Sequence, residues 1–169
     1  GLGYIGLPTA AMFASRGVSV VGVDISQDVV DIINKGEIHI VEPELAGLVY
    51  SSVSKGTLMA TTIPEPADAY LIAVPTPFKA SKNSDQEPDL KFIESAVRSI
   101  GPILKQGDLV ILESTSPVGT TELVASWLAD AREDLTFPSQ TNNKPDVNVA
   151  HCPERVLPGH IVRELVEND

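Results

Sequence analysis

A glycine-rich turn opens the chain and constrains its fold more than any other feature. The run Gly1-Leu2-Gly3-Tyr4-Ile5-Gly6 has the GxGxxG spacing, and Asp24 lies 18 positions after the last glycine. In a dinucleotide-binding βαβ unit, such a turn lets the backbone approach a pyrophosphate, and an acid at about this distance binds the ribose. The helix that follows points its free N–H groups at the phosphates. We therefore expect cofactor contacts from Gly1, Gly3, Tyr4, Ile5, Gly6 and Asp24.

Asp24 also indicates which dinucleotide is bound. Asp24 follows an apolar run at residues 18–23, which is typical of a strand. A carboxylate there accepts hydrogen bonds from ribose hydroxyls and repels a 2′-phosphate, so NAD is favoured over NADP. The alternative interpretation is an exposed acid at a strand end.

Helical and strand patterns alternate along the rest of the chain. We expect strands at residues 18–24, 58–61, 69–74, 108–114 and 147–152, and helices at 4–15, 26–34, 43–54, 89–104, 117–132 and 162–166. This order predicts an α/β fold, a Rossmann-type doubly wound parallel sheet with helices on both faces. The glycine turn of that fold follows a strand, and because no residue precedes Gly1, we expect the first strand to be missing from the chain.

Length and composition limit the remaining classes of protein. With 169 residues, 43% of them hydrophobic, we expect one sizeable core and a single domain at 1–169. The net charge of −11 argues against nucleic-acid and anionic-membrane partners. No apolar run approaches the roughly 20 residues of a membrane span. The single cysteine, Cys152, rules out an internal disulfide and favours a reducing, cytoplasmic location.

Two predicted strands end in loops that suit a ligand, because open parallel sheets bind ligands at their carboxyl edge. After the strand at 69–74, Val74-Pro75-Thr76-Pro77 follows a rigid path that suits a cofactor wall, or is only a stiff turn. After the strand at 108–114, Ser114, Thr115 and Ser116 either cap the next helix or place a hydroxyl beside a nicotinamide or a substrate.

The last predicted strand leads into a segment with a possible acid–base pair. Glu154 and Arg155 stand between prolines and offer a proton acceptor and an anion-binding fork, or else a surface ion pair. His151, Cys152 and His160 lack metal-ligand spacing, so we expect no metal. Cys152 precedes a proline, which favours a structural thiol over a nucleophile.

Together these motifs resemble the NAD-binding N-terminal part of the UDP-glucose/GDP-mannose dehydrogenase family. The resemblance rests on residues 1–8, 23–24, 41–43, 74–77, 113–119 and 152–159, and extends over essentially the whole chain. It implies an enzyme that oxidises the C6 alcohol of a UDP-sugar to a carboxylate with two NAD. At the aldehyde stage, a cysteine of the family binds the sugar covalently as a thiohemiacetal and then as a thioester, which water hydrolyses. It also implies catalytic roles for Thr115 and Glu154, cofactor contacts from Val74, Pro75, Thr76, Ser114 and Thr115, and substrate contacts from Glu154, Arg155 and Val156.

The departures from the family pattern are equally informative. The UDP-glucose branch has a second acid where this chain has Pro158, so the resemblance favours the hexosamine branch. The family's Gly-Gly-His-Cys nucleophile, with its lysine and aspartate, is not in these residues, and Cys152 does not match it. We therefore expect the central and UDP-sugar-binding domains to be absent, the chain alone to lack turnover and the complete enzyme to be a homodimer. The alternatives are a dehydrogenase of UDP-N-acetylglucosamine or UDP-glucose, a one-step 2-hydroxyacid or sugar-phosphate dehydrogenase, and a non-catalytic dinucleotide-binding module.

Overall fold

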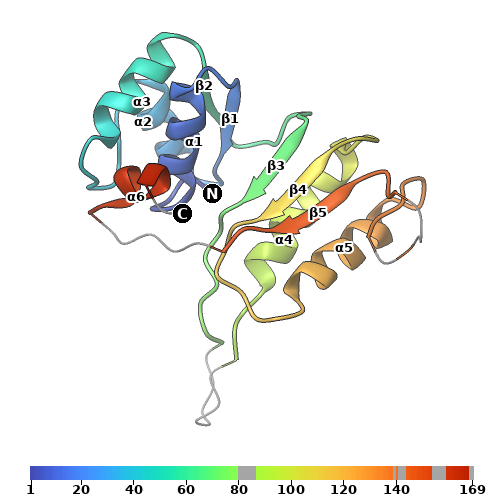
Figure 1. Ribbon diagram of the computed structural model, residues 1–169. Coiled ribbons are helices and arrows are strands. Elements are labelled where there is room, and N and C mark those ends of the chain that lie inside the picture. Colours follow the sequence, from blue (N-terminus) through green and yellow to red (C-terminus); the bar gives the residue numbers. More distant parts are fainter. Residues whose placement is uncertain (80–86, 139, 141–143, 154–158, 168–169) are drawn as a thin grey trace. The chain divides into compact units, whose positions relative to one another are not determined.

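The chain forms two compact units, each with its own parallel sheet (Figure 1). The computed structural model describes residues 1–79, 87–138, 140, 144–153 and 159–167. Unit 1 comprises residues 1–64 and 155–169, and unit 2 comprises residues 65–154. The predicted α/β class with parallel strands is confirmed in both units.

Within its described residues, unit 1 has a two-stranded sheet and four helices. Strands β1 (Val20–Val23) and β2 (Leu58–Thr61) pair in parallel, with Val20 opposite Leu58. The helices are α1 (Gly6–Ser15), α2 (Gln27–Asn34), α3 (Leu45–Ser54) and α6 (Ile161–Glu167). Ser26 caps α2, because its hydroxyl accepts a hydrogen bond of 3.4 Å from the N–H of Val29. Gly36, with φ of +77°, ends the same helix in a left-handed turn.

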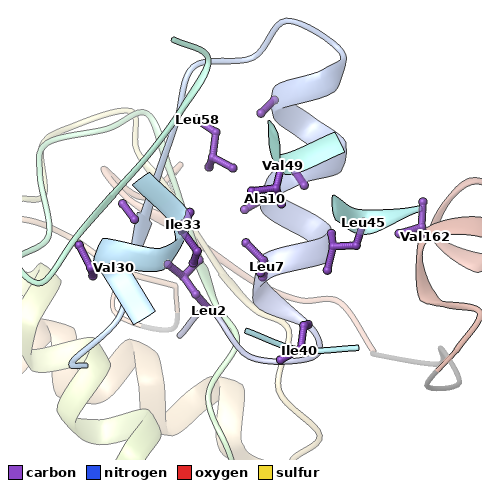
Figure 2. Packing of buried hydrophobic residues seen from close by; sticks show 13 residues of the cluster. Leu2, Leu7, Ala10, Val30, Ile33, Ile40, Leu45, Val49, Leu58 and Val162 are labelled. Carbon is purple, nitrogen blue, oxygen red and sulfur yellow. The ribbon is translucent and has the colours of Figure 1, made fainter. Parts of the chain in front are cut away.

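The core of unit 1 is built from the apolar faces of its helices against the sheet (Figure 2). Fully or almost fully buried members are Leu2, Leu7, Val30, Ile33, Leu45, Val49 and Leu58, and Val162 of α6 packs among them. Leu2 comes from the glycine turn itself, so the turn is anchored in the core at its second residue.

In the part of unit 2 that the structure describes, three parallel strands lie in the order β3 (Ala69–Ile72), β4 (Leu109–Leu112) and β5 (Asn148–His151). They pair in register, with Ile72 opposite Leu112 and Leu112 opposite His151. Helices α4 (Lys91–Ile100) and α5 (Thr120–Ala131) pack together and complete the core, in which Phe137 and Val110 are fully buried. The classic doubly wound sheet has the strand order 3-2-1-4-5-6. The pair β1–β2 of unit 1 matches strands 2 and 3 of that order, and β3–β4–β5 of unit 2 matches strands 4, 5 and 6.

The differences from the sequence-based expectations have simple physical causes. The helix expected at 89–104 stops at Ile100 and continues as a short 3₁₀ turn, η1 (Gly101–Ile103), since Pro102 lacks the N–H that an α-helix needs. In place of the one core expected, the buried residues form two clusters, one in each unit. Within the described residues, no helix has the length and apolar character to cross a membrane.

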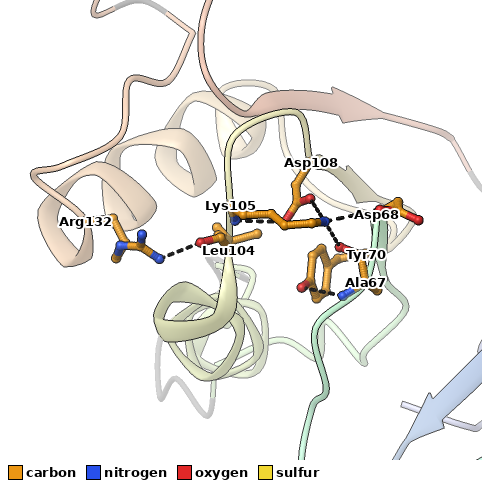
Figure 3. A network of polar contacts seen from close by, with 7 residues as sticks. All are labelled: Ala67, Asp68, Tyr70, Leu104, Lys105, Asp108 and Arg132. Carbon is orange, nitrogen blue, oxygen red and sulfur yellow. Dashed lines mark hydrogen bonds and ion pairs between the residues drawn. The ribbon is translucent and has the colours of Figure 1, made fainter.

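A network of polar contacts braces the amino ends of β3 and β4 in unit 2 (Figure 3). The carboxylate of Asp108 is buried, with 1% of its side chain exposed, and it accepts hydrogen bonds from the backbone N–H and the ammonium group of Lys105. Asp68 binds the same ammonium group at 3.1 Å. The bond to Asp108, with a second to Asp68, raises the pKa of Lys105 above its ordinary value. Beside them, Arg132 donates to the carbonyl of Leu104 at 2.7 Å.

This network predicts that the turn before β4 depends on one carboxylate. The substitution Asp108→Ala removes the acceptor for both donors of Lys105, and we expect it to lower the free energy of unfolding by about 2 kcal/mol. Chemical denaturation followed by circular dichroism measures the change. Asp130→Ala, an exposed position on α5, is the matched control and should leave the stability nearly unchanged. Equal stability of both variants would contradict the bracing role.

Candidate functional site

The glycine turn forms an exposed backbone loop that leads directly into α1. Gly1, Gly3 and Tyr4 are exposed, and the carbonyl of Gly3 accepts the N–H of Leu7 at 3.1 Å as the helix begins. A Cβ added at Gly3 would meet no protein atom within 4 Å. Crowding by the described residues therefore does not account for glycine at this position, and the open backbone suits the close approach of a phosphate group.

Asp24, the predicted ribose-binding acid, lies against this turn. One of its carboxylate oxygens, Oδ2, accepts the N–H of Leu2 at 2.8 Å, and the other, Oδ1, accepts the N–H of Ser26 at 3.0 Å. The side chain is only partly buried. Because each carboxylate oxygen has more than one acceptor site, the group keeps capacity for hydroxyl donors from a ligand.

Gly22 is a contributor to the turn that the sequence analysis did not identify. A Cβ at Gly22 would lie 2.7 Å from Cδ2 and 3.0 Å from Cδ1 of Leu2. Leu2 is 2% exposed and lies in the core, so it has little room to withdraw. The glycine in β1 therefore makes space for the side chain that anchors the glycine turn. A glycine inside an apolar strand run was the available signal for such a close approach.

In unit 2, the loops after β3 and β4 are joined by Ser114. Its hydroxyl accepts the N–H of Val74 at 2.9 Å and lies 2.7 Å from the Val74 carbonyl, to which it can donate. The hydroxyl of Thr76 donates to the carbonyl of Thr115 at 2.5 Å. Val74, Thr76, Ser114 and Thr115, all predicted cofactor residues, thus come together in one hydrogen-bonded group, with Pro75 exposed beside them.

The structure argues against the capping interpretation of Ser114, Thr115 and Ser116. Helix α5 begins at Thr120, and its N-cap residue is Gly119, with φ of +92° and no side-chain cap. Ser114, Thr115 and Ser116 therefore do not cap α5. Ser114 is 5% exposed and serves the loop contacts, whereas Thr115 is exposed at the surface.

The loop after β5 is described only at its two ends. The N–H of Cys152 donates to the carbonyl of Leu112 at 2.9 Å, which extends the pairing of β5 with β4. Cys152 is a free and exposed cysteine. Glu154, Arg155 and Val156, the predicted substrate residues, lie outside the described residues. Among the residues that are described, no group of three or more His, Cys, Asp or Glu side chains is placed to hold a metal ion.

Comparison with known proteins gives a consistent family. The model of the UDP-glucose/GDP-mannose dehydrogenase family, NAD binding domain, matches residues 1–169. The chain is 64% identical over 169 residues to a UDP-N-acetyl-D-mannosamine dehydrogenase of Campylobacter jejuni, covering 100% of this chain and 41% of the relative. It is also 64% identical over the same length to an NDP-N-acetyl-D-galactosaminuronic acid dehydrogenase of Ralstonia nicotianae, covering 100% of this chain and 39% of that protein.

The solved structures agree with the sequence relatives. A UDP-D-ManNAc dehydrogenase from Pyrococcus horikoshii matches with a TM-score of 0.88 and 42% identity, covering 99% of this chain and 38% of that chain. The chain therefore spans about two-fifths of the length of the relatives that it matches.

The packing of Leu2 against β1 predicts that Gly22 supports the glycine turn. In Gly22→Ala, the new methyl group must displace Leu2, and we expect a loss of about 1–3 kcal/mol in the free energy of unfolding, together with weaker NAD binding. Denaturation and calorimetric titration with NAD measure both effects. Gly47→Ala in α3, where an added Cβ meets nothing within 4 Å, is the control and should not weaken NAD binding. Unchanged NAD affinity in Gly22→Ala would show that the turn does not depend on this packing.

Proposed function

This chain belongs to the UDP-glucose/GDP-mannose dehydrogenase family as its NAD-binding domain, and we propose that it supplies the NAD site of an enzyme that oxidises the C6 alcohol of a UDP-sugar to a carboxylate. The observation that carries the proposal is the contact of Asp24 with the glycine turn, in a chain that the family matches from residue 1 to 169. Full oxidation of an alcohol to a carboxylate removes four electrons, so each substrate molecule consumes two NAD.

The residues present fit NAD. The open backbone at Gly3 leaves room for a pyrophosphate, and α1 begins directly after the turn with its amino end available to a negative charge. Asp24 would accept hydrogen bonds from ribose hydroxyls and disfavour the 2′-phosphate of NADP. The bound cofactor would supply a hydride acceptor for the oxidation. In unit 2, we assign further cofactor contacts to Val74, Pro75, Thr76, Ser114 and Thr115.

For the substrate, we propose UDP-N-acetyl-D-mannosamine, oxidised to UDP-N-acetyl-D-mannosaminuronate. Support comes from the name of the Campylobacter relative and from Pro158, which stands where the UDP-glucose branch has a second acid. A second candidate is an N-acetylgalactosamine nucleotide, because the Ralstonia relative, which is also 64% identical, is an NDP-N-acetyl-D-galactosaminuronic acid dehydrogenase.

We assign roles to the remaining site residues from the family resemblance, and the chemistry of each side chain suits its role. Thr115 is exposed and belongs to the hydrogen-bonded group that it forms with Val74, Thr76 and Ser114. We assign its hydroxyl to the reacting region, where it would orient water or the substrate hydroxyl. Glu154 would take up protons during oxidation and during hydrolysis of the enzyme-bound thioester. Arg155 would bind an anionic group of the nucleotide sugar through its guanidinium fork, and Val156 would line the same site.

The setting of the domain is also a proposal. We infer that residues 1–169 act as one NAD-binding domain, which is supported by the match of a single family model to the whole chain. The complete enzyme would form a homodimer and supply the nucleophilic cysteine from residues beyond these 169. A cytoplasmic location suits a chain whose single cysteine is free.

The stoichiometry of NADH tests the proposed function. With the full-length gene product, UDP-N-acetyl-D-mannosamine should yield two NADH per sugar and a uronate product, measured by absorbance at end point and by mass spectrometry. Residues 1–169 alone should give no steady NADH production, since they lack a Gly-Gly-His-Cys sequence. One NADH per sugar would favour a one-step dehydrogenase, and no NADH with any nucleotide sugar would overturn the proposal.

A further inference from the structure

The side chain of Asn34, the last residue of α2, is bound to the backbone of β2. Its Nδ2 donates to the carbonyl of Ala60 at 2.9 Å, and its Oδ1 accepts the N–H of the same residue at 2.8 Å. Asn34 is exposed, so these bonds, and not burial in the core, hold its side chain. The carboxamide therefore joins the end of α2 to the sheet, and it has no role in the site described so far.

The two bonds occupy the edge of β2 that faces away from β1. Strand β2 and its flank pair with β1 through alternate residues, since the carbonyls of Thr57 and Thr61 accept N–H groups from the β1 side. The backbone groups of Ala60 therefore face the opposite edge. There the carboxamide of Asn34 satisfies both the N–H and the carbonyl of one residue, as a further strand would do.

Ala60 lies at the point of the sheet against which the glycine turn packs. It is directly opposite Gly22 of β1 in the register of the two strands. Leu2 of the glycine turn packs over Gly22, where an added Cβ would lie 2.7 Å from Cδ2 of Leu2. Ala60 and Leu2 are both buried members of the unit 1 core. A shift of β2 at Ala60 therefore acts on the part of β1 that supports the turn.

Helix α2 is held at its other end by the predicted ribose-binding acid. The N–H of Ser26, the N-cap residue of α2, donates to Oδ1 of Asp24 at 3.0 Å. Between the two ends, Val30 and Ile33 are buried in the core of unit 1 (Figure 2). The helix is thus tied to Asp24 at its start and to β2 through Asn34 at its end, with its apolar face against the core.

We propose that Asn34 is a positioning residue for NAD, which holds α2 and β2 together so that Asp24 and the glycine turn keep the arrangement that binds the cofactor. Asn34 contacts no ligand in this role. It acts through α2, which borders the acid, and through β2, which supports the turn. Holding a site in its binding arrangement raises affinity, because less has to be ordered when the ligand binds. The effect falls on NAD and not on the sugar, and the inference rests on the proposed function.

Titration of the full-length enzyme with NAD tests this role. Asn34→Ala removes both bonds to Ala60, and alanine favours a helix, so α2 itself is not weakened. We expect Kd and KM for NAD to rise about fivefold, with KM for UDP-N-acetyl-D-mannosamine within about twofold of the parent. Amide hydrogen exchange at Ala60 should become faster. Asn34→Asp keeps the acceptor for the N–H of Ala60 but loses the donor to its carbonyl, and should lie between the parent and Asn34→Ala.

The matched control is Gln27→Ala, at the first residue of the same helix. Gln27 is exposed, and its amide donates to Oδ1 of Asp31 within α2 at 2.7 Å. Its loss leaves the helix attached to the sheet, so Kd for NAD should equal that of the parent. Faster exchange at Ala60 in Asn34→Ala with an unchanged Kd for NAD would show a purely structural role and overturn the proposal. An equal loss for NAD and for the sugar would overturn it as well.

Two further outcomes are separated by the same measurements. If Asn34→Ala does not fold, Asn34→Asp carries the same comparison of NAD with the sugar. A parent enzyme that binds NAD but oxidises no UDP-sugar would overturn the proposed function, whereas the Kd values for NAD of the parent and the variants would still decide the role of Asn34.

Discussion

The position of the glycine turn in unit 1 depends on the two hydrogen bonds that Asp24 accepts from the N–H groups of Leu2 and Ser26. Leu2 belongs to the glycine turn, and Asp24 follows β1, so one carboxylate fixes the turn to the end of the strand. The packing of Leu2 into the space over Gly22 supports the same arrangement from the apolar side. If Asp24 accepts ribose hydroxyls as we propose, little reorganisation is needed on binding, because its carboxylate is already held in position.

The same physical device recurs at two other places, each within one unit. Ser114 binds the backbone of Val74 and so joins the loops after β3 and β4 in unit 2. Asn34 binds the backbone of Ala60 in unit 1. In each case a polar side chain binds main-chain groups of another segment and does not depend on that segment's side chains. The exposed residues that we assign to chemistry, such as Thr115, remain accessible.

Much of the fold could be predicted from the sequence because its signals are local. Strand β2 was predicted with its observed bounds, and the cap of α2 at Ser26 follows from a preference that acts within three residues. The predicted start of α5 at residue 117 was wrong. The helix begins at Thr120, and its N-cap is Gly119 in a left-handed conformation and not one of the hydroxyl residues 114–116. Asn34 could not be assigned a role, because its partner is the backbone of Ala60, 26 positions away, which leaves no pattern in the sequence. The close approach at Gly22 likewise depends on a packing partner from another element.

The central claim is that the glycine turn and Asp24 form an NAD site, and calorimetric titration of residues 1–169 with NAD and, in parallel, with NADP tests it most directly. The account predicts binding of NAD with a one-to-one stoichiometry and much weaker binding of NADP, because the carboxylate of Asp24 opposes the 2′-phosphate. In Asp24→Ala, NAD affinity should fall and the difference between the two cofactors should shrink. Equal affinity for NAD and NADP, or no change in Asp24→Ala, would contradict the account.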